Sequence, residues 1–121
     1  MEFIKKDEIK TFVNPGVVSR QLLNPENSSS RRVTITQVTV EAGESQPRHS
    51  HDASEQIWIC MDGEGYLLLA DDKEQLFLPG DVVRFEDKDV HGIKNHTSKS
   101  LTYISVTCPP INFAYAYQPQ K

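Results

Sequence analysis

The chain has 121 residues, 37% of them hydrophobic and 25% charged, with a formal net charge of −4. This length and composition indicate one globular domain over residues 1–121. The basic residues are scattered, so no nucleic-acid partner is expected, because phosphate binding depends on clustered Lys and Arg. No apolar run is long enough to span a membrane, and the opening stretch MEFIKKDEIK lacks the hydrophobic segment of a signal peptide. We therefore expect no membrane partner and a cytoplasmic location.

Short β-strands dominate the predicted secondary structure. In chain order, NPENSSS (residues 24–30) predicts a surface loop, and RRVTITQVTVEAG (Arg31–Gly43) predicts a strand rich in Val, Ile and Thr. Further strand-forming runs follow: QIWICM, GYLLLA, QLFLPG, DVVRF and LTYISVT. Polar turns or turns with Gly or Pro separate them, and no segment keeps a helical period for long. Strands at intervals of about ten residues indicate an all-β sandwich or barrel.

Two pairs of histidines stand out within this β pattern. His49 and His51 are separated by one residue, so both rings project to the same side of an extended segment. Imidazoles on one face can begin a divalent-metal site, although an isolated His-x-His is more often a surface accident. His91 and His96 are five positions apart and face opposite ways in a strand, so alternation allows at most one of them to join such a site.

The spacing around the first pair resembles a motif of the cupin superfamily. That motif is Gly, five residues, His-x-His, three or four residues, Glu, six residues, Gly. Here Gly43 and Gly63 enclose His49, His51 and the pair Glu55-Gln56.

A second cupin motif follows, with Gly, five residues, Pro, one residue, Gly, two residues, His, three residues and Asn. Gly80, His91 and Asn95 match its spacings, while Glu86 and Lys88 replace the Pro and the second Gly. The motifs span residues 43–63 and 80–95. The resemblance implies an all-β double-stranded β-helix, the jelly-roll barrel of this superfamily.

The resemblance also implies one divalent metal ion (Zn, Ni, Fe, Mn or Cu) bound by His49, His51, Gln56 and His91. Gln56 takes the fourth position because it satisfies both spacings of the first motif, whereas Glu55 leaves one residue too many before Gly63. Glu55 and Gln56 also face opposite sides of a strand. A neutral amide in place of a carboxylate leaves the +2 charge of the ion uncompensated, which weakens metal binding and favours an anionic or enolisable ligand.

Two further residues each have two possible roles. Trp58 and Cys60 share the parity of Gln56, so they either line the pocket beyond the metal or pack the core. Cys60 and Cys108 are expected to be reduced thiols in strands.

The remaining charged and aromatic candidates do not occupy motif positions. Arg84 is expected to point outward, and His96 is expected to be exposed. Tyr115 and Tyr117 in FAYAY can cap a pocket or a dimer contact.

The resemblance leaves the function open, because cupins include dioxygenases, isomerases, decarboxylases, lyases, sugar-binding modules and sensory domains. The leading hypothesis is a metalloenzyme with dioxygenase-like oxidoreductase chemistry on a small oxygen-rich or anionic molecule. The alternatives are a non-catalytic module that binds or senses a sugar or carboxylate, a metal-dependent isomerase or lyase, and a metal that only stabilises the barrel. The resemblance also implies a homodimer, in which edge strands are covered and EFIKKDEI can serve as an exchanged strand.

Overall fold

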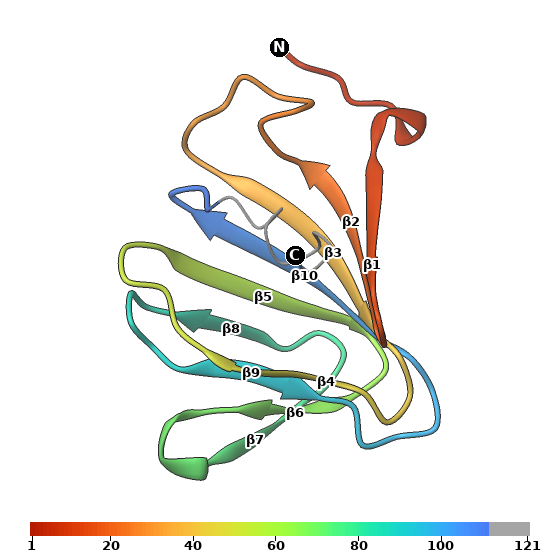
Figure 1. Ribbon diagram of the computed structural model, residues 1–121, viewed down its shortest axis with the longest axis vertical. Helices are drawn as coiled ribbons and strands as arrows, with labels where there is room; N and C mark the ends of the chain where they lie inside the picture. The colour runs from red at the N-terminus through yellow and green to blue at the C-terminus, as the bar shows by residue number, and fades with distance from the viewer. Residues whose placement is uncertain (112–121) are drawn as a thin grey trace, which may run out of the picture.

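The computed structural model describes residues 1–111, and β-strands make up most of its regular structure (Figure 1). Two short 3-10 segments, η1 (Lys6–Glu8) and η2 (Ala70–Asp72), accompany them. The strands are β1 (Lys10–Asn14), β2 (Val17–Leu23), β3 (Thr34–Val40), β4 (Ser45–His49), β5 (Glu55–Asp62), β6 (Gly65–Leu68), β7 (Glu74–Phe77), β8 (Val82–Phe85), β9 (His91–Lys94) and β10 (Leu101–Cys108). Over the described residues, no helix is both long and apolar enough to cross a membrane.

Two antiparallel sheets form the walls of a double-stranded β-helix (Figure 1). The larger sheet has the strand order β1-β2-β3-β10-β5-β8, and the smaller one has the order β4-β9-β6-β7. From β3 onward the chain passes repeatedly between the two sheets, so segments far apart in the sequence meet between the walls. The expected all-β jelly roll is therefore confirmed.

The inner face of the larger sheet changes character along its strands. Burial alternates with period two in β5 and β10, as expected for strands with one face inside. At one end, Val17, Val40 and Leu101 are cross-strand neighbours in a fully apolar row. Two rows further along, polar residues take the inward positions, and this polar end of the sheet lies beside the motif histidines.

The structure confirms the strands expected from RRVTITQVTVEAG and from the five shorter runs, with ends shifted by a few residues. It adds β1, β2, β4 and β9. In β2 the inward positions include Ser19 and Gln21, which weaken the hydrophobic alternation that signals a strand.

The N-terminal segment EFIKKDEI and the tyrosines near the C-terminus were also assigned possible roles from the sequence. Lys6–Glu8 form η1, and β1 begins at Lys10 and pairs with β2 of the same chain. Tyr115 and Tyr117 lie outside the described residues.

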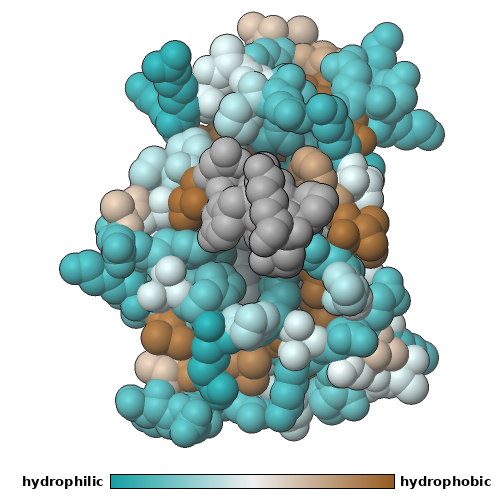
Figure 2. Space-filling model, in the orientation of Figure 1, coloured by the Kyte–Doolittle hydropathy of each residue, from teal (hydrophilic) through white to brown (hydrophobic). Residues whose placement is uncertain are grey.

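Figure 2 shows one face covered mainly by hydrophilic residues, with separate hydrophobic patches between them.

Candidate metal centre

The histidines of the two motifs meet where β4 and β9 pair. His49 lies directly across from His91 in this antiparallel pair, next to an irregularity in the register of β4. Gly92 lets the strands approach closely, because a Cβ built on it would lie 2.8 Å from the Gln46 carbonyl oxygen. His51 follows β4 by two residues and joins the group from the loop that leads into β5.

The three imidazole rings form a tight triad. One ring nitrogen from each of His49, His51 and His91 lies within 4.8 Å of the other two. The ring centroids are 4.3 Å apart for His49 and His91, 5.0 Å for His49 and His51, and 5.2 Å for His51 and His91. Metal–nitrogen bonds of about 2.0–2.1 Å are within reach of such a cluster after a small closure of the side chains.

Backbone carbonyls orient two of these rings. The Nδ1 atom of His49 lies 2.9 Å from the Pro47 carbonyl oxygen, and Nδ1 of His91 lies 3.0 Å from that of Asp89. A carbonyl oxygen only accepts, so each Nδ1 carries the proton and each Nε2 keeps its lone pair. The His91 Nε2 atom is buried and has no hydrogen-bond partner among residues 1–111. A buried nitrogen of this kind is costly unless something binds it.

The surroundings keep the buried imidazoles neutral. Burial, together with nearby His49, lowers the pKa of His91 to about 4. Burial and His49 also lower the pKa of His51. Neutral imidazole is the form that binds a metal, so His51 and His91 are ready to act as ligands at neutral pH.

Aromatic packing holds His91 in place. Its ring stacks on Phe85 at a centroid distance of 4.6 Å, and Trp58 meets it edge-on at 5.6 Å. His91 is only 1% exposed, whereas His49 is exposed. The triad therefore has a closed side at β9 and an open side at β4.

Gln56 lies beside the triad, as its motif position predicts. The Trp58 indole N–H donates to the Gln56 amide oxygen at 2.9 Å, and the Gln56 amide nitrogen lies 3.5 Å from His51 Nε2. Because the indole can only donate, it holds the oxygen end of the amide. If this bond is kept, ligation by Gln56 requires its oxygen to bind the metal and accept from the indole together.

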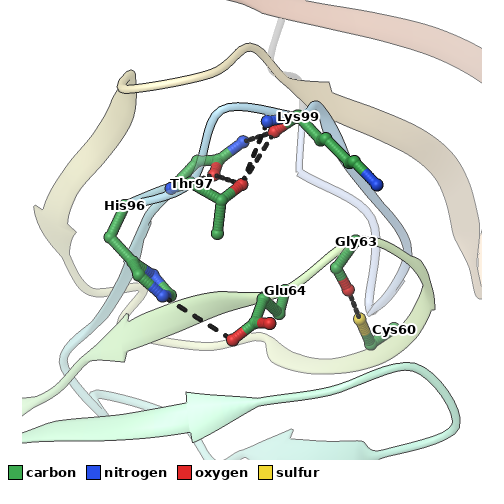
Figure 3. A network of polar contacts seen from close by, with 7 residues as sticks. Cys60, Gly63, Glu64, His96, Thr97 and Lys99 are labelled. Atoms are coloured by element: carbon green, nitrogen blue, oxygen red, sulfur yellow. Dashed lines mark hydrogen bonds and ion pairs between the residues drawn. The ribbon is translucent and has the colours of Figure 1, made fainter.

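A cavity of about 410 Å³ opens beside His49, His51 and Gln56. Trp58 lines it and also belongs to the hydrophobic core, so both roles expected for Trp58 are confirmed. Cys60 belongs only to the core, where its thiol donates to the Gly63 carbonyl oxygen at 3.5 Å (Figure 3). Burial raises the pKa of Cys60 to about 11. Both cysteines are free thiols, as expected.

Other charged candidates lie away from the triad. Glu55 faces outward and binds Arg84, with Arg84 Nε and Nη2 each 2.8 Å from one Glu55 oxygen. His96 is exposed and lies 3.6 Å from a Glu64 oxygen, as Figure 3 shows. The exposed positions expected for Arg84 and His96 are therefore confirmed, and Glu55 lies on the opposite face from Gln56, as expected.

The remaining motif residues shape turns. Gly43, Gly63 and Gly80 all have positive φ, and so does Lys88, with φ of 71°, at the position where the cupin motif has Gly. Asn95 is 2% exposed, and its amide nitrogen donates to two backbone carbonyls while its oxygen accepts from Thr97. Asn95 therefore bonds the backbone around the turn that follows β9.

Comparison with known families agrees with this geometry. A family model described as the cupin domain matches residues 36–107, more than half of the chain. The chain belongs to the cupin family. This cupin is 27% identical over 113 residues to an uncharacterized protein of Methanocaldococcus jannaschii, a match that covers 91% of this chain and 90% of the relative.

Solved structures share the fold at lower identity. The polyketide cyclase RemF from Streptomyces resistomycificus superimposes with a TM-score of 0.79 at 18% identity, covering 91% of this chain and 80% of that one. A cupin-superfamily sugar phosphate isomerase from Silicibacter pomeroyi gives a TM-score of 0.77 at 20% identity, covering 89% and 76%. At such identities these similarities establish the shared fold.

Proposed function

We propose that this cupin holds one divalent metal ion through His49, His51 and His91 and binds a small oxygen-rich molecule at it. The buried Nε2 of His91, without a partner among residues 1–111, is the observation that carries the proposal. One ring nitrogen of His91 lies within 4.8 Å of a ring nitrogen of each other imidazole, and its Nδ1 is already occupied by the Asp89 carbonyl oxygen. Three imidazoles suit zinc, iron, nickel or copper.

Gln56 completes the ligand set in this proposal through its amide oxygen, with Trp58 holding that oxygen in place. A bound divalent ion supplies Lewis-acid polarisation of a ligand oxygen or a water molecule. Because the amide is neutral, the centre keeps a +2 charge and attracts a carboxylate or enolate oxygen more strongly than a site with Glu would.

The open side of the triad supports ligand exchange over a purely structural metal. Structural zinc sites are closed to solvent, whereas catalytic sites keep a side open to ligands. Here His49 is exposed and borders the cavity. The names of two fold neighbours, a polyketide cyclase and a sugar phosphate isomerase, also refer to oxygen-rich compounds.

Dioxygenase-type oxidoreductase chemistry is the second candidate, because imidazole ligands also suit iron and copper. Dioxygen consumption that depends on both bound iron and an added chelating ligand would support this candidate. Turnover with zinc, which has no redox chemistry, favours an isomerase or lyase instead.

Calorimetric titration with glycolate, a small chelating hydroxy acid, tests the proposal. We expect saturable binding to the metal-loaded protein and a loss of at least tenfold in affinity for the metal-free protein. The His91→Ala variant should behave as the metal-free protein does. Equal binding by the loaded and metal-free proteins would contradict a metal-borne site.

A further inference from the structure

Polar residues form a row across the inner face of the larger sheet, beyond the candidate metal centre. Gln21 of β2 pairs with Thr36 of β3, and Thr36 pairs with Ser105 of β10. Ser105 pairs in turn with Trp58 of β5, which bonds Gln56 beside the triad. The row therefore runs continuously from the far wall of the cavity to the metal centre.

Stability alone does not account for this polar row. Gln21 and Ser105 are each 8% exposed, and both line the cavity together with Thr36. Within residues 1–111, the side chains of these three residues form no hydrogen bond. The polar atoms of these side chains are not fully buried, so they stay accessible from the cavity. Apolar residues at these inward positions would add hydrophobic burial to the barrel, so a polar row that faces the cavity is typical of a binding surface.

The charge of the cavity restricts what this row can bind. Among its described lining residues there is no Lys, Arg, Asp or Glu, and amide and hydroxyl groups make up most of the polar part. A phosphate or a second carboxylate at the far end would lose its hydration without meeting a cation, which is costly. Uncharged hydroxyl and carbonyl groups, in contrast, match amide and hydroxyl side chains, which both donate and accept hydrogen bonds.

We propose that Gln21, Thr36 and Ser105 form a second subsite for uncharged oxygen groups of a molecule whose other end chelates the metal. This inference rests on the proposed function, since it places one end of the ligand at the metal. It narrows the substrate class to polyoxygenated compounds with at most one anionic group, at the chelating end, and it excludes phosphorylated ones.

Three related probes separate the two ends of the site in the metal-loaded full chain. Glycolate carries only the chelating end, gluconate adds a chain of hydroxyl groups, and 6-phosphogluconate adds a phosphate to that chain. By calorimetry we expect gluconate to bind at least tenfold more tightly than glycolate, because each added hydrogen bond contributes a factor of about two to ten. Addition of the phosphate should weaken binding at least tenfold.

Substitutions in the row test whether the higher affinity for gluconate comes from the subsite. Gln21→Leu and Ser105→Ala should each weaken gluconate binding about threefold to tenfold and leave zinc binding and glycolate binding within twofold. Gln37→Leu is the matched control, because it makes the same change on the outward face of β3, where Gln37 accepts a hydrogen bond from Arg20. Thermal unfolding checks that each variant is folded.

The outcomes distinguish the subsite from the metal centre. Equal affinities for gluconate and glycolate, or a loss in Gln37→Leu as large as in Gln21→Leu, would overturn the subsite. Tight binding of 6-phosphogluconate would overturn the exclusion of phosphorylated ligands. Failure of glycolate to bind the metal-loaded protein would instead contradict the proposed function.

Discussion

His91 differs from the other histidines of the chain in its near-complete enclosure. It is 1% exposed, stacked on Phe85, and its Nε2 has no hydrogen-bond partner within residues 1–111. Burial, with His49 nearby, lowers its pKa to about 4, whereas an unfolded chain restores the ordinary value near 6.5. Sequence spacing predicted that this residue belongs to the site, but the enclosure became visible only in the fold.

This pKa difference predicts how the stability of the metal-free protein depends on pH. Above pH 6.5 His91 is neutral in both states and has no effect. Below pH 6.5 the unfolded chain gains a proton that the folded chain does not accept, so the free energy of unfolding falls as the pH approaches 4. At pH 5 the loss attributable to His91 is about 2 kcal/mol. Urea denaturation at pH 7 and pH 5 measures it.

The control for this prediction is His91→Leu, which removes the titrating group and keeps an apolar side chain in the pocket. Its loss of stability between pH 7 and pH 5 should be smaller than that of the wild type by about 2 kcal/mol. Equal losses in the two proteins would show that His91 does not titrate in this way.

The neutral amide of Gln56 beside the triad can be replaced by a carboxylate of nearly the same shape. Gln56→Glu adds a negative charge next to the ion and still offers an oxygen to the Trp58 indole. We expect the zinc dissociation constant to fall at least tenfold, because opposite charges attract strongly at a partly buried site. Glycolate should bind more weakly, since the charge of the centre drops by one. Competition with a chelator of known affinity measures the first effect.

The adjacent residue provides the matched control. Glu55 faces outward and pairs with Arg84, so Glu55→Gln should leave zinc binding unchanged. An unaltered zinc affinity in Gln56→Glu, or an equal change in Glu55→Gln, would contradict the position assigned to Gln56.

At the scale of single elements, the strands rich in Val, Ile, Thr and aromatic residues were predictable and the ones that carry the histidines were not. β3 and β10 contain many such residues, and β5 contains a continuous apolar run from Ile57 to Met61 between polar residues. β4 and β9 are short and contain Pro, His and Gly, so propensity gives them no signal. The motif spacing located His49 and His91 without locating their strands.

Sequence patterns did not indicate the polar wall of the cavity for a related reason. Ser19 and Gln21 have the same parity as Val17 and therefore face inward, but polar residues in a short strand ordinarily indicate the solvent side. Only the register of β2 against β3 and β10 shows that Gln21 and Ser105 belong to one row. Pairing between distant segments is not encoded in local sequence patterns, so this subsite required the fold.

The turn before β9 contains a non-glycine residue with positive φ. Lys88 has φ of 71° in a turn closed by a hydrogen bond from the Asp89 N–H to the Glu86 carbonyl oxygen at 3.0 Å. This conformation costs a non-glycine residue about 1–2 kcal/mol. Lys88→Gly should therefore raise the free energy of unfolding by about 1 kcal/mol, after the greater entropy of glycine in the unfolded chain is subtracted.

Urea denaturation of Lys88→Gly beside Asp87→Gly checks this effect. Asp87 is in the same exposed turn but is not among the residues with positive φ, so glycine there should only destabilise. If both variants lose stability equally, Lys88 is not strained.

For the whole molecule, the edges of the larger sheet bear on assembly. β1 and β8 are its edge strands, and each exposes a valine: Val13 is 68% exposed and Val82 is 63% exposed. Exposed apolar edges promote association, so we propose that the protein is a homodimer. Light scattering at micromolar concentration should give twice the 13.7 kDa mass of one chain.

Substitution of the edge valines extends this test. Lysine at an edge blocks pairing, so Val13→Lys or Val82→Lys, whichever edge forms the contact, should yield a monomer that remains folded. A mass of one chain for the wild type would contradict the dimer.

The metal content of the purified protein decides whether the histidine triad is a metal centre. Elemental analysis of wild type, His91→Ala and His96→Ala prepared side by side compares a histidine of the triad with an exposed one that pairs with Glu64. We expect about one equivalent of a divalent transition metal in the wild type and in His96→Ala, and loss of most of it in His91→Ala. A wild type that binds no divalent ion even after reconstitution, or a His91→Ala variant that keeps the full equivalent, would contradict the metal centre.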